Sequence, residues 1–385
     1  MKEELFKNYT LGTHRTVAPA ETLARIQPHL ASMGVTRCAD VSGLDRLGIP
    51  VYCAIRPCSR DLQVANGKGL TVTDAKVSAL MEAIELFHAD HPAVEFRRQS
   101  RSSLEREGRP VIAPSILPDY KRENYFSDDF STDWIVAEDL LMNQEVWVPA
   151  SMAYVCNPRL CTFSSNGLAS GNHLVEATLH AIYEVVERDA VSGLNVDGQL
   201  YLSPQTCRFI DLRTVSDGPV SALNHMLREA EIKLLLIWVR SPIPVHTFMA
   251  VFIDKKSFGN SSLVNIGYGS HLSLSVAATR AITEAAQSRL TFIHGSRQDL
   301  KTETYQHTHE SVYRFFDAIE AMTPWQTLNE TVGESLFEDY QYVLRSLSEA
   351  GYEHAFRVDM SGLVPDISVT KVVIPGMKMI ASLFQ

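Results

Sequence analysis

Three stretches share one pattern, A-x-x-x-A-[L/I]-x-E-x-x-[E/Q]: AKVSALMEAIE (75–85), ATLHAIYEVVE (177–187) and AATRAITEAAQ (277–287). Their central acids, Glu82, Glu184 and Glu284, are separated by 102 and 100 residues. Ala, Leu and Glu are good helix formers, so short likenesses of this kind also arise by chance. The near-equal spacing nevertheless favours three related modules, each contributing one helix to a shared site.

Short β-branched runs at 233–239, 245–253 and 263–267 alternate with helical runs. Strands and helices mixed in this way predict a layered α/β (α+β) fold. We expect an N-terminal segment over 1–60, a core over 61–300 and a C-terminal segment over 301–385 that packs on the core. Together these form one large domain.

The composition excludes several classes of protein. The 385 residues include 35 Lys and Arg against 45 Asp and Glu, a net charge of −10 that disfavours nucleic acid and anionic membranes as partners. Neither a membrane-spanning run nor a signal peptide is visible, which predicts a cytoplasmic protein. Two C-x4-C pairs, Cys53/Cys58 and Cys156/Cys161, are interpreted as buried thiols rather than as a zinc site.

On each predicted helix, polar residues repeat on one face and apolar residues occupy the others. Buried carboxylates must be paired, protonated or bound to metal. A cluster of acids from two helices provides hard oxygen ligands of the kind that Mg²⁺ prefers. The cluster consists of Glu82, Glu85, Glu184 and Glu187.

Two other interpretations of these acids stay open. A di-iron or di-manganese site normally uses a Glu-x-x-His element on each of two helices. Here both spacings are Glu-x-x-Glu, but His180 lies one turn before Glu184. The second alternative is a structural network of buried Glu–Arg pairs.

A glycine-bearing segment precedes each acidic helix, at 66–69, 166–172 and 267–271. Glycines allow close approach of the backbone, and free N–H groups at helix N-termini favour anions. We therefore expect these segments to be loops beside Mg²⁺-bound phosphates, with Lys68 supplying positive charge. Neither a Walker P-loop nor a G-x-G-x-x-G after a strand is present, so the common nucleotide folds are excluded.

At these residues the sequence resembles the YcaO family, over roughly residues 11–299. Two further stretches, 42–50 (SGLDRLGIP) and 295–297 (GSR), also look like family signatures. The helical elements of the resemblance are Ser78-x3-Glu82-x2-Glu85, Glu176-x7-Glu184-x2-Glu187-Arg188-Asp189 and Arg280-x3-Glu284-x2-Gln287-x-Arg289.

The resemblance implies a YcaO-type ATP-binding fold, with ATP and Mg²⁺ held between acidic helices. Enzymes of this family use ATP to phosphorylate the oxygen of a peptide-backbone amide, and a nucleophile then replaces that oxygen. A Cys, Ser or Thr side chain gives an azoline, and external sulfide gives a thioamide. By resemblance, the Mg²⁺ ligands are Glu82, Glu85, Glu184 and Glu187. The ATP contacts are Ser78, Asn172, Glu176, Arg188, Arg280 and Glu284, with Lys68 a weaker phosphate candidate; Gln287 and Arg289 are structural or substrate-side groups.

Two features indicate the subtype. Residues 12–15 (GTHR) and 19–22 resemble members that work with a TfuA protein, for which thioamidation is expected, and the ending 374–385 lacks the proline-rich tail frequent in azoline-forming members. We expect a thioamide-forming enzyme that acts on a precursor peptide with a sulfide donor and a TfuA-type partner. The alternatives are an azoline-forming cyclodehydratase, a non-catalytic peptide-binding scaffold and a di-metal carboxylate oxidoreductase. A homodimer is the family-level expectation.

Overall fold

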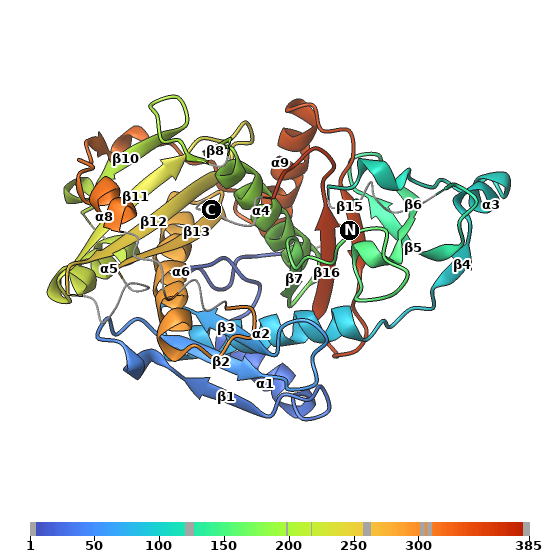
Figure 1. Cartoon of the computed structure of the whole chain (residues 1–385), viewed down its shortest axis with the longest axis horizontal. Coiled ribbons are helices and arrows are strands. Elements are labelled where there is room, and N and C mark those ends of the chain that lie inside the picture. The colour runs from blue at the N-terminus through green and yellow to red at the C-terminus, as the bar shows by residue number, and fades with distance from the viewer. Residues whose placement is uncertain are drawn as a thin grey trace.

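The computed structural model describes residues 5–118, 120, 127–197, 199–216, 218–256, 263–300, 305 and 310–379. Part of the final run at 374–385 lies outside these residues. Three sheets surround a central region, and helices α2 (Val72–Asp90), α4 (Leu174–Ser192) and α6 (Leu274–His294) lie between them (Figure 1). The mixed α/β prediction is therefore confirmed.

The first sheet is antiparallel and consists of β1 (Arg37–Asp40), β2 (Val51–Ile55) and β3 (Val64–Lys68). β3 is an end strand, and the chain turns directly from it into helix α2 (Val72–Asp90). Thr71 and Asp74 form a capping box at the start of α2, which satisfies two backbone N–H groups and fixes where this helix begins.

The second sheet joins the middle of the chain to its C-terminal part. Its last strand, β7, leads into helix α4 (Leu174–Ser192). The strands follow the order β4 (Arg97–Gln99), β5 (Thr132–Asp139), β15 (Phe356–Asp359), β16 (Ser368–Val373) and β7 (Leu168–Gly171), and β6 (Gln144–Pro149) also pairs with β5.

The third sheet ends in β13, which leads into helix α6 (Leu274–His294). β11, β12 and the first part of β13 confirm the strands predicted from the β-branched runs. The order is β13 (Val264–His271), β12 (His246–Asp254), β11 (Ile232–Val239), β10 (Cys207–Asp211) and β14 (Thr323–Pro324).

The remaining elements cover the outside of this framework. Among the residues that the structure describes, no helix is both long and apolar enough to cross a membrane. The elements on the outside are the hairpin of β8 (Asn195–Val196) and β9 (Gln199–Leu200), and helices α1 (Pro19–Ile26), α3 (Arg101–Arg106), α5 (Gly218–Glu229), α8 (Glu310–Asp317) and α9 (Leu336–Glu349).

Each acidic helix thus follows the end strand of its own sheet, as three related modules would require. Gly67 on β3 and Gly269 on β13 each precede the central acid of the next helix by 15 residues. A Cβ at Gly67 would lie 1.9 Å from the Ala79 backbone nitrogen, and one at Gly269 would lie 2.5 Å from that of Ala281. Glycine on the strand and alanine on the helix therefore let the two backbones pack closely in both units.

This packing corrects the expectation that the glycine-bearing segments are anion-binding loops. Gly67 and Lys68 belong to β3, and Gly267 and Gly269 belong to β13. The glycines are needed because a helix presses on the strand, and the polar groups that reach the centre of the protein are side chains.

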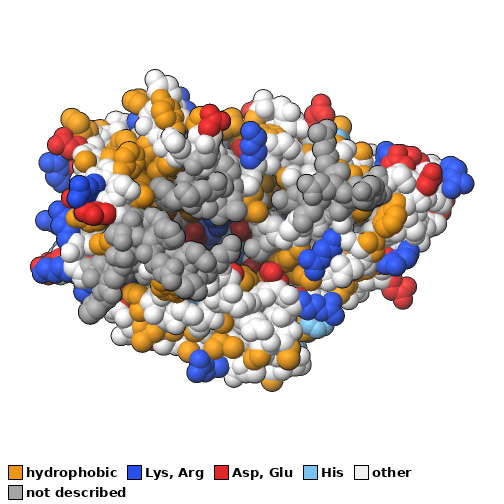
Figure 2. Space-filling model, viewed as in Figure 1, with side chains coloured by type: hydrophobic (Ala, Val, Ile, Leu, Met, Phe, Trp, Pro, Cys, Tyr) orange, Lys and Arg blue, Asp and Glu red, His pale blue; other side chains and the backbone are white. Residues whose placement is uncertain are grey.

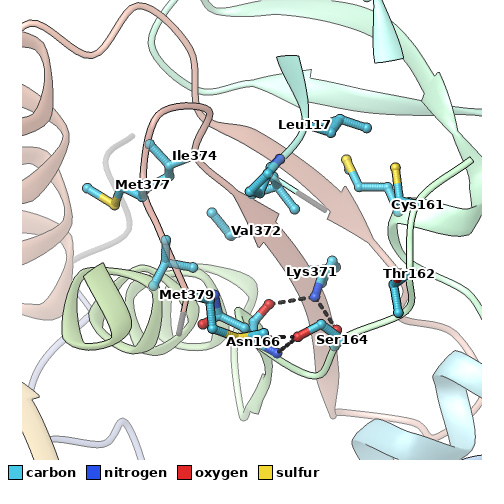
Figure 3. Close-up of a pocket in the computed structure, with 14 residues that line it drawn as sticks. Leu117, Cys161, Thr162, Ser164, Asn166, Lys371, Val372, Ile374, Met377 and Met379 are labelled. Atoms are coloured by element: carbon cyan, nitrogen blue, oxygen red, sulfur yellow. Dashed lines mark hydrogen bonds between the residues drawn. The ribbon is translucent and has the colours of Figure 1, made fainter. Parts of the chain in front are cut away.

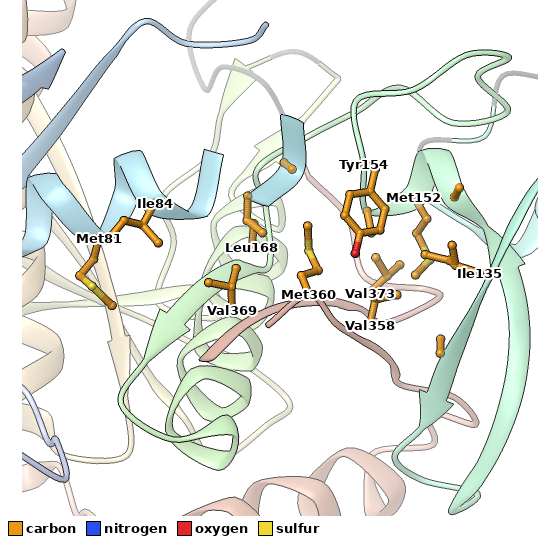
Figure 4. Close-up of a cluster of buried hydrophobic side chains, with 14 of the residues drawn as sticks. Met81, Ile84, Ile135, Met152, Tyr154, Leu168, Val358, Met360, Val369 and Val373 are labelled. Atoms are coloured by element: carbon orange, nitrogen blue, oxygen red, sulfur yellow. The ribbon is translucent and has the colours of Figure 1, made fainter. Parts of the chain in front are cut away.

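Hydrophobic packing sets which face of α2 points to the centre. Met81 and Ile84 of α2 belong to the same buried cluster as Leu168 of β7 and Val369 of β16 (Figure 4). The apolar residues of α2 are thereby buried between the first and the second sheet, and Glu82 and Glu85 lie at the edge of a cavity.

The cysteines follow the thiol prediction in part. Cys53 and Cys161 are buried and Cys156 is partly buried, but Cys58 is exposed, so the prediction was wrong for Cys58. It precedes a polar run, SRDLQ (59–63), on the connection from β2 to β3, where no hydrophobic layer covers it.

Candidate functional site

A cavity of about 680 Å³ lies where α2, α4 and α6 meet. Figure 2 shows a hollow near the middle of this face of the molecule, with acidic and basic side chains inside it. Every residue predicted as a metal ligand or ATP contact lines this cavity: Lys68, Ser78, Glu82, Glu85, Asn172, Glu176, Glu184, Glu187, Arg188, Arg280 and Glu284.

The four predicted metal ligands form a glutamate cluster (Glu82, Glu85, Glu184 and Glu187) on two helices. Burial raises the pKa of Glu82 to about 7, although Arg297 and Lys68 oppose the shift. Burial and the nearby charges of Glu82 and Glu184 raise the pKa of Glu85 to about 8. The pKa of Glu184 is also raised by burial, and that of Glu187 reaches about 7. Without a cation, these groups share negative charge that the protein does not fully neutralise.

Basic side chains gather around Glu284 on the third helix. The Lys68 ammonium donates to Glu284 Oε2 at 2.6 Å. Arg188 Nη2 lies 3.9 Å from Glu284 Oε1 and 3.7 Å from Glu187 Oε1. Burial opposes ionisation of Glu284, but Lys68 and Arg188 outweigh it and lower its pKa to about 2. Glu284 is therefore a permanent anion that holds two cations at the cavity wall.

Arg280 is a cavity-lining basic residue with unsatisfied hydrogen-bonding capacity. Its Nε is buried and has no hydrogen-bond partner among the described residues. Burial lowers the pKa of this guanidinium, with only partial compensation from Glu187 and the more distant acids. An incompletely paired guanidinium facing a cavity fits an anionic ligand such as a phosphate.

Glu176 and Asn172 fasten the N-terminal segment to the start of α4. Glu176 is 2% exposed, and it accepts from the Thr16 N–H at 2.7 Å, from Arg15 Nη1 at 3.2 Å and from the Asn172 N–H at 3.0 Å. Asn172 Oδ1 also accepts from Thr22. Asn172 lies just before α4, at the end of the 166–172 segment. This network makes residues 11–17 a wall of the cavity.

Three neutral imidazoles accompany the cavity. His180 lines it, and burial holds its pKa well below the usual value. Burial also lowers the pKa of His14 to about 4, and the ring of His14 lies 4.6 Å from that of His271. Uncharged rings add no positive charge, so the cations that balance the glutamates are Lys and Arg side chains, among them Lys68, Arg188, Arg280 and Arg297.

The carboxylates and basic side chains of the cavity fit a nucleotide with Mg²⁺ better than a metal ion alone. Among the described residues, no group of three or more His, Cys, Asp or Glu side chains stands ready to enclose a metal. Mg²⁺ commonly uses one or two carboxylates and completes its shell with phosphates and water. Raised carboxylate pKa values beside the unpaired Arg280 Nε match that arrangement.

Two arginines from the sequence signatures have different surroundings. Arg289 lies away from the cavity, in buried ion pairs with Asp45 at 2.7 Å and Asp254 at 2.9 Å, which fasten α6 to the 42–50 stretch and to β12. Arg297 lines the cavity and pairs with Asp299 at 2.5 Å. The sequence reasoning did not assign Arg297 to the site, although its place directly after α6 was a usable signal.

A small cavity of about 30 Å³ adjoins the second sheet (Figure 3). Beside it, Lys371 on β16 donates to the backbone oxygens of Ser164 and Asn166, both at 2.5 Å. These bonds hold the segment that enters β7. The cavity has room for little more than a water molecule, so its described lining has a structural role.

Comparison with known sequences identifies a family. Residues 66–378 match the YcaO family model, described as "YcaO cyclodehydratase, ATP- and Mg²⁺-binding". A protein of Methanothermobacter thermautotrophicus is 32% identical over 380 residues, covering 94% of this chain and 95% of its own. A Rhizobium leguminosarum bv. trifolii protein named for its place in the tfuA 3′ region is 32% identical over 384 residues, covering 94% and 88%.

Solved structures share the fold. The Methanopyrus kandleri YcaO bound with AMPPCP and Mg²⁺ superposes with a TM-score of 0.76 at 22% identity, covering 97% of this chain and 94% of that one. A heterocyclase in complex with substrate and cofactor gives a TM-score of 0.80 at 20% identity, covering 100% and 55%. The YcaO-type fold predicted by resemblance is confirmed.

Proposed function

This chain belongs to the YcaO family, and we propose that it is an ATP- and Mg²⁺-dependent enzyme that activates a backbone amide of a peptide. The observation that carries the proposal is one cavity in which the glutamate cluster faces Lys68, Arg188 and Arg280. A triphosphate with Mg²⁺ supplies the positive charge that the glutamates need and the negative charge that the basic side chains need.

In the proposed reaction, the amide oxygen attacks the γ-phosphorus of ATP, and the bond from that phosphorus to the β–γ bridging oxygen breaks, which releases ADP. A nucleophile then adds to the amide carbon, and the C–O bond breaks as phosphate departs with the original amide oxygen. Phosphorylation is required because an amide oxygen is a poor leaving group. Bound Mg²⁺ would neutralise charge on the phosphoryl oxygens.

The chain's own residues have separate proposed roles. The glutamate cluster would ligate Mg²⁺ through its oxygens. Arg280 would donate to phosphate oxygens with the guanidinium that has an unpaired Nε, and Arg188 would do so beside Glu284. Ser78 and Lys68 line the same cavity and are proposed as further nucleotide contacts.

Asn172, Glu176 and Glu284 are also proposed as nucleotide contacts. Each of them also makes hydrogen bonds or ion pairs within the protein. Both oxygens of Glu176 already accept hydrogen bonds from the N-terminal segment and Asn172. Glu284 holds Lys68 and Arg188. These residues would therefore shape the wall against which a nucleotide lies.

For the nucleophile we propose sulfide, which gives a thioamide in a precursor peptide. Support comes from residues 12–15 and 19–22, which resemble TfuA-associated members, and from the relative named for the tfuA 3′ region. A TfuA-type partner and a sulfide donor belong to this proposal, as do a homodimer and a cytoplasmic setting. An azoline-forming cyclodehydratase is the second candidate, favoured by the family description.

The other sequence alternatives have less support. A di-metal oxidoreductase does not require a cavity with Lys68, Arg188 and Arg280 on its walls. A non-catalytic scaffold does not require four buried carboxylates whose pKa values are raised. The description of the family as ATP- and Mg²⁺-binding favours the nucleotide function over both.

Calorimetric titration with ATP, with and without Mg²⁺, tests the proposal. We expect Mg²⁺-dependent binding that weakens in Glu82→Gln and Glu187→Gln, because an amide removes the charge of a metal ligand. Glu145→Gln on exposed β6 is the matched control and should behave as wild type. Folded wild-type protein with no Mg²⁺-dependent affinity for ATP would end the proposal.

The mass of the product distinguishes the two nucleophiles. With the peptide, ATP, Mg²⁺ and sulfide, exchange of oxygen for sulfur adds about 16 Da, whereas azoline formation removes about 18 Da as water. A sulfide-independent loss of water would replace thioamidation by cyclodehydration.

A further inference from the structure

Three residues occupy the same place in the three modules. Lys68 on β3, Ser170 on β7 and Ser270 on β13 each precede the central acid of the following helix by 14 residues. All three lie on end strands whose helices enter the cavity. Their side chains can therefore be compared directly.

Two of these side chains cross to the acidic helix of another module. Lys68 reaches Glu284 on α6 at 2.6 Å, and the Ser170 hydroxyl donates to Glu85 Oε1 on α2 at 2.5 Å. Ser270 instead bonds Thr247 on β12, in its own sheet, at 2.7 Å. The strand of one module thus holds a carboxylate supplied by a different module in two of the three cases.

The surroundings of Glu85 differ from those of Glu187 and Glu284. Glu284 has Lys68, and Glu187 has Arg188 within 3.7 Å. Within the described parts of the chain, Ser170 is the residue that hydrogen-bonds the Glu85 carboxylate. The orientation of this carboxylate is therefore set by Ser170, through its hydroxyl and its backbone, and the described residues form no ion pair with Glu85.

Ser170 is held rigidly enough to impose that orientation. It is 3% exposed, and β7 pairs with β16 so that Ser170 lies opposite Val369. Lys371 on β16 anchors the segment that enters β7 through Ser164 and Asn166 (Figure 3). A donor on a buried, paired strand keeps its position when a ligand binds.

We propose that Ser170 is a positioning residue that fixes the Glu85 carboxylate for Mg²⁺, an inference that rests on the proposed function. Its hydroxyl donates to Oε1 of a carboxylate that lines the cavity. Ser170 would act on Mg²⁺ only through Glu85. Removing the hydroxyl should therefore affect the metal more than the nucleotide.

The test is a Mg²⁺ titration of the full chain with a non-hydrolysable ATP analogue, followed by calorimetry. We expect Ser170→Ala to need on the order of tenfold more Mg²⁺ for half-saturation, as for loss of a hydrogen bond to a charged group. Affinity for the analogue at saturating Mg²⁺ should stay near that of wild type. Ser170→Thr, which retains a hydroxyl, should restore most of the Mg²⁺ response.

Ser270→Ala is the matched control, because Ser270 is 1% exposed at the equivalent strand position but contacts Thr247. It should leave the Mg²⁺ titration unchanged. In a Glu85→Gln background, Ser170→Ala should add little further loss, since both changes act on one contact.

An unchanged Mg²⁺ response in Ser170→Ala, beside a responsive wild type, would overturn this inference and leave the proposed function standing. Equal losses in Ser170→Ala and Ser270→Ala would also overturn it, since they would report general loosening of the strands. A wild type without Mg²⁺-dependent binding would remove both proposals.

Discussion

Replacing Glu85 by Gln is expected to stabilise the nucleotide-free protein at alkaline pH. Glu85 lies in the cavity beside Glu82 and Glu184, and its pKa rises from 4.5 to about 8, first through burial and then through these charges. Gln has the same shape and can still accept from Ser170, but it carries no charge. The substitution therefore removes repulsion while it keeps the local contacts.

The pH window follows from the direction of the shift. Between about pH 4.5 and pH 8, folded Glu85 retains a proton that the unfolded chain has lost, so folding stability falls as pH rises through this window. The full shift corresponds to ~5 kcal/mol. Water in the cavity screens the charge, so we expect a gain of about 1–2 kcal/mol for Glu85→Gln at pH 8.5 and little change near pH 5.

Urea unfolding in EDTA at pH 5, 7 and 8.5 measures this difference. Glu176→Gln is the contrasting control: although burial opposes ionisation, Arg15 and the backbone donors lower the pKa of Glu176. Its contribution to stability is present above pH 4.5 and lost on acidification, so this variant should lose about 2 kcal/mol at pH 8.5. A Glu85→Gln protein no more stable than wild type at pH 8.5 would show that the Glu85 charge does not destabilise the fold.

Three further outcomes are expected. MgATP binding at pH 7 should release about one proton, because the glutamates titrate near that pH. The binding heats measured by calorimetry should therefore differ between buffers of unlike ionisation enthalpy, and heats that do not depend on the buffer would contradict this prediction. Arg280→Met should weaken ATP binding by about tenfold or more without loss of thermal stability, since its guanidinium is incompletely paired; destabilisation with intact ATP affinity would be the opposite result. Gly67→Ala should lose ~3 kcal/mol or more in urea unfolding because its Cβ would collide with α2, whereas Gly43→Ala, with nothing within 4 Å, should change stability by less than about 0.5 kcal/mol; similar losses in both would contradict the packing argument.

Helical periodicity was sufficient to predict that the polar stripes of three helices meet in the cavity, but not that Lys68, Asn172 or Arg297 joins them. Residues four and three apart share a helix face in any fold, so the stripe from Ser78 to Glu85 was readable locally. The apolar surround of each stripe indicated burial, and the structure brings the three stripes together at one cavity. The family resemblance then supplied the ligand chemistry that the residue pattern left open.

Contacts between modules could not be predicted from local sequence patterns. Nothing near Ser170 in the sequence indicates that its hydroxyl meets a carboxylate 85 residues away, because that pairing depends on how two sheets pack. The glycines were misread for a related reason: Gly67 looks like a turn residue until α2 is seen against β3. A glycine inside an alternating apolar run is a usable signal of such close packing.

The end-strand placement of the acidic helices has a consequence for how this architecture can grow. Because β3, β7 and β13 carry the helices, the opposite edges of their sheets begin with β1, β4 and β14, several strands away from the cavity in the larger two sheets. Insertions or fused modules at those distant borders would leave the ligand-facing geometry intact. The periphery is therefore free to diversify while the centre stays fixed.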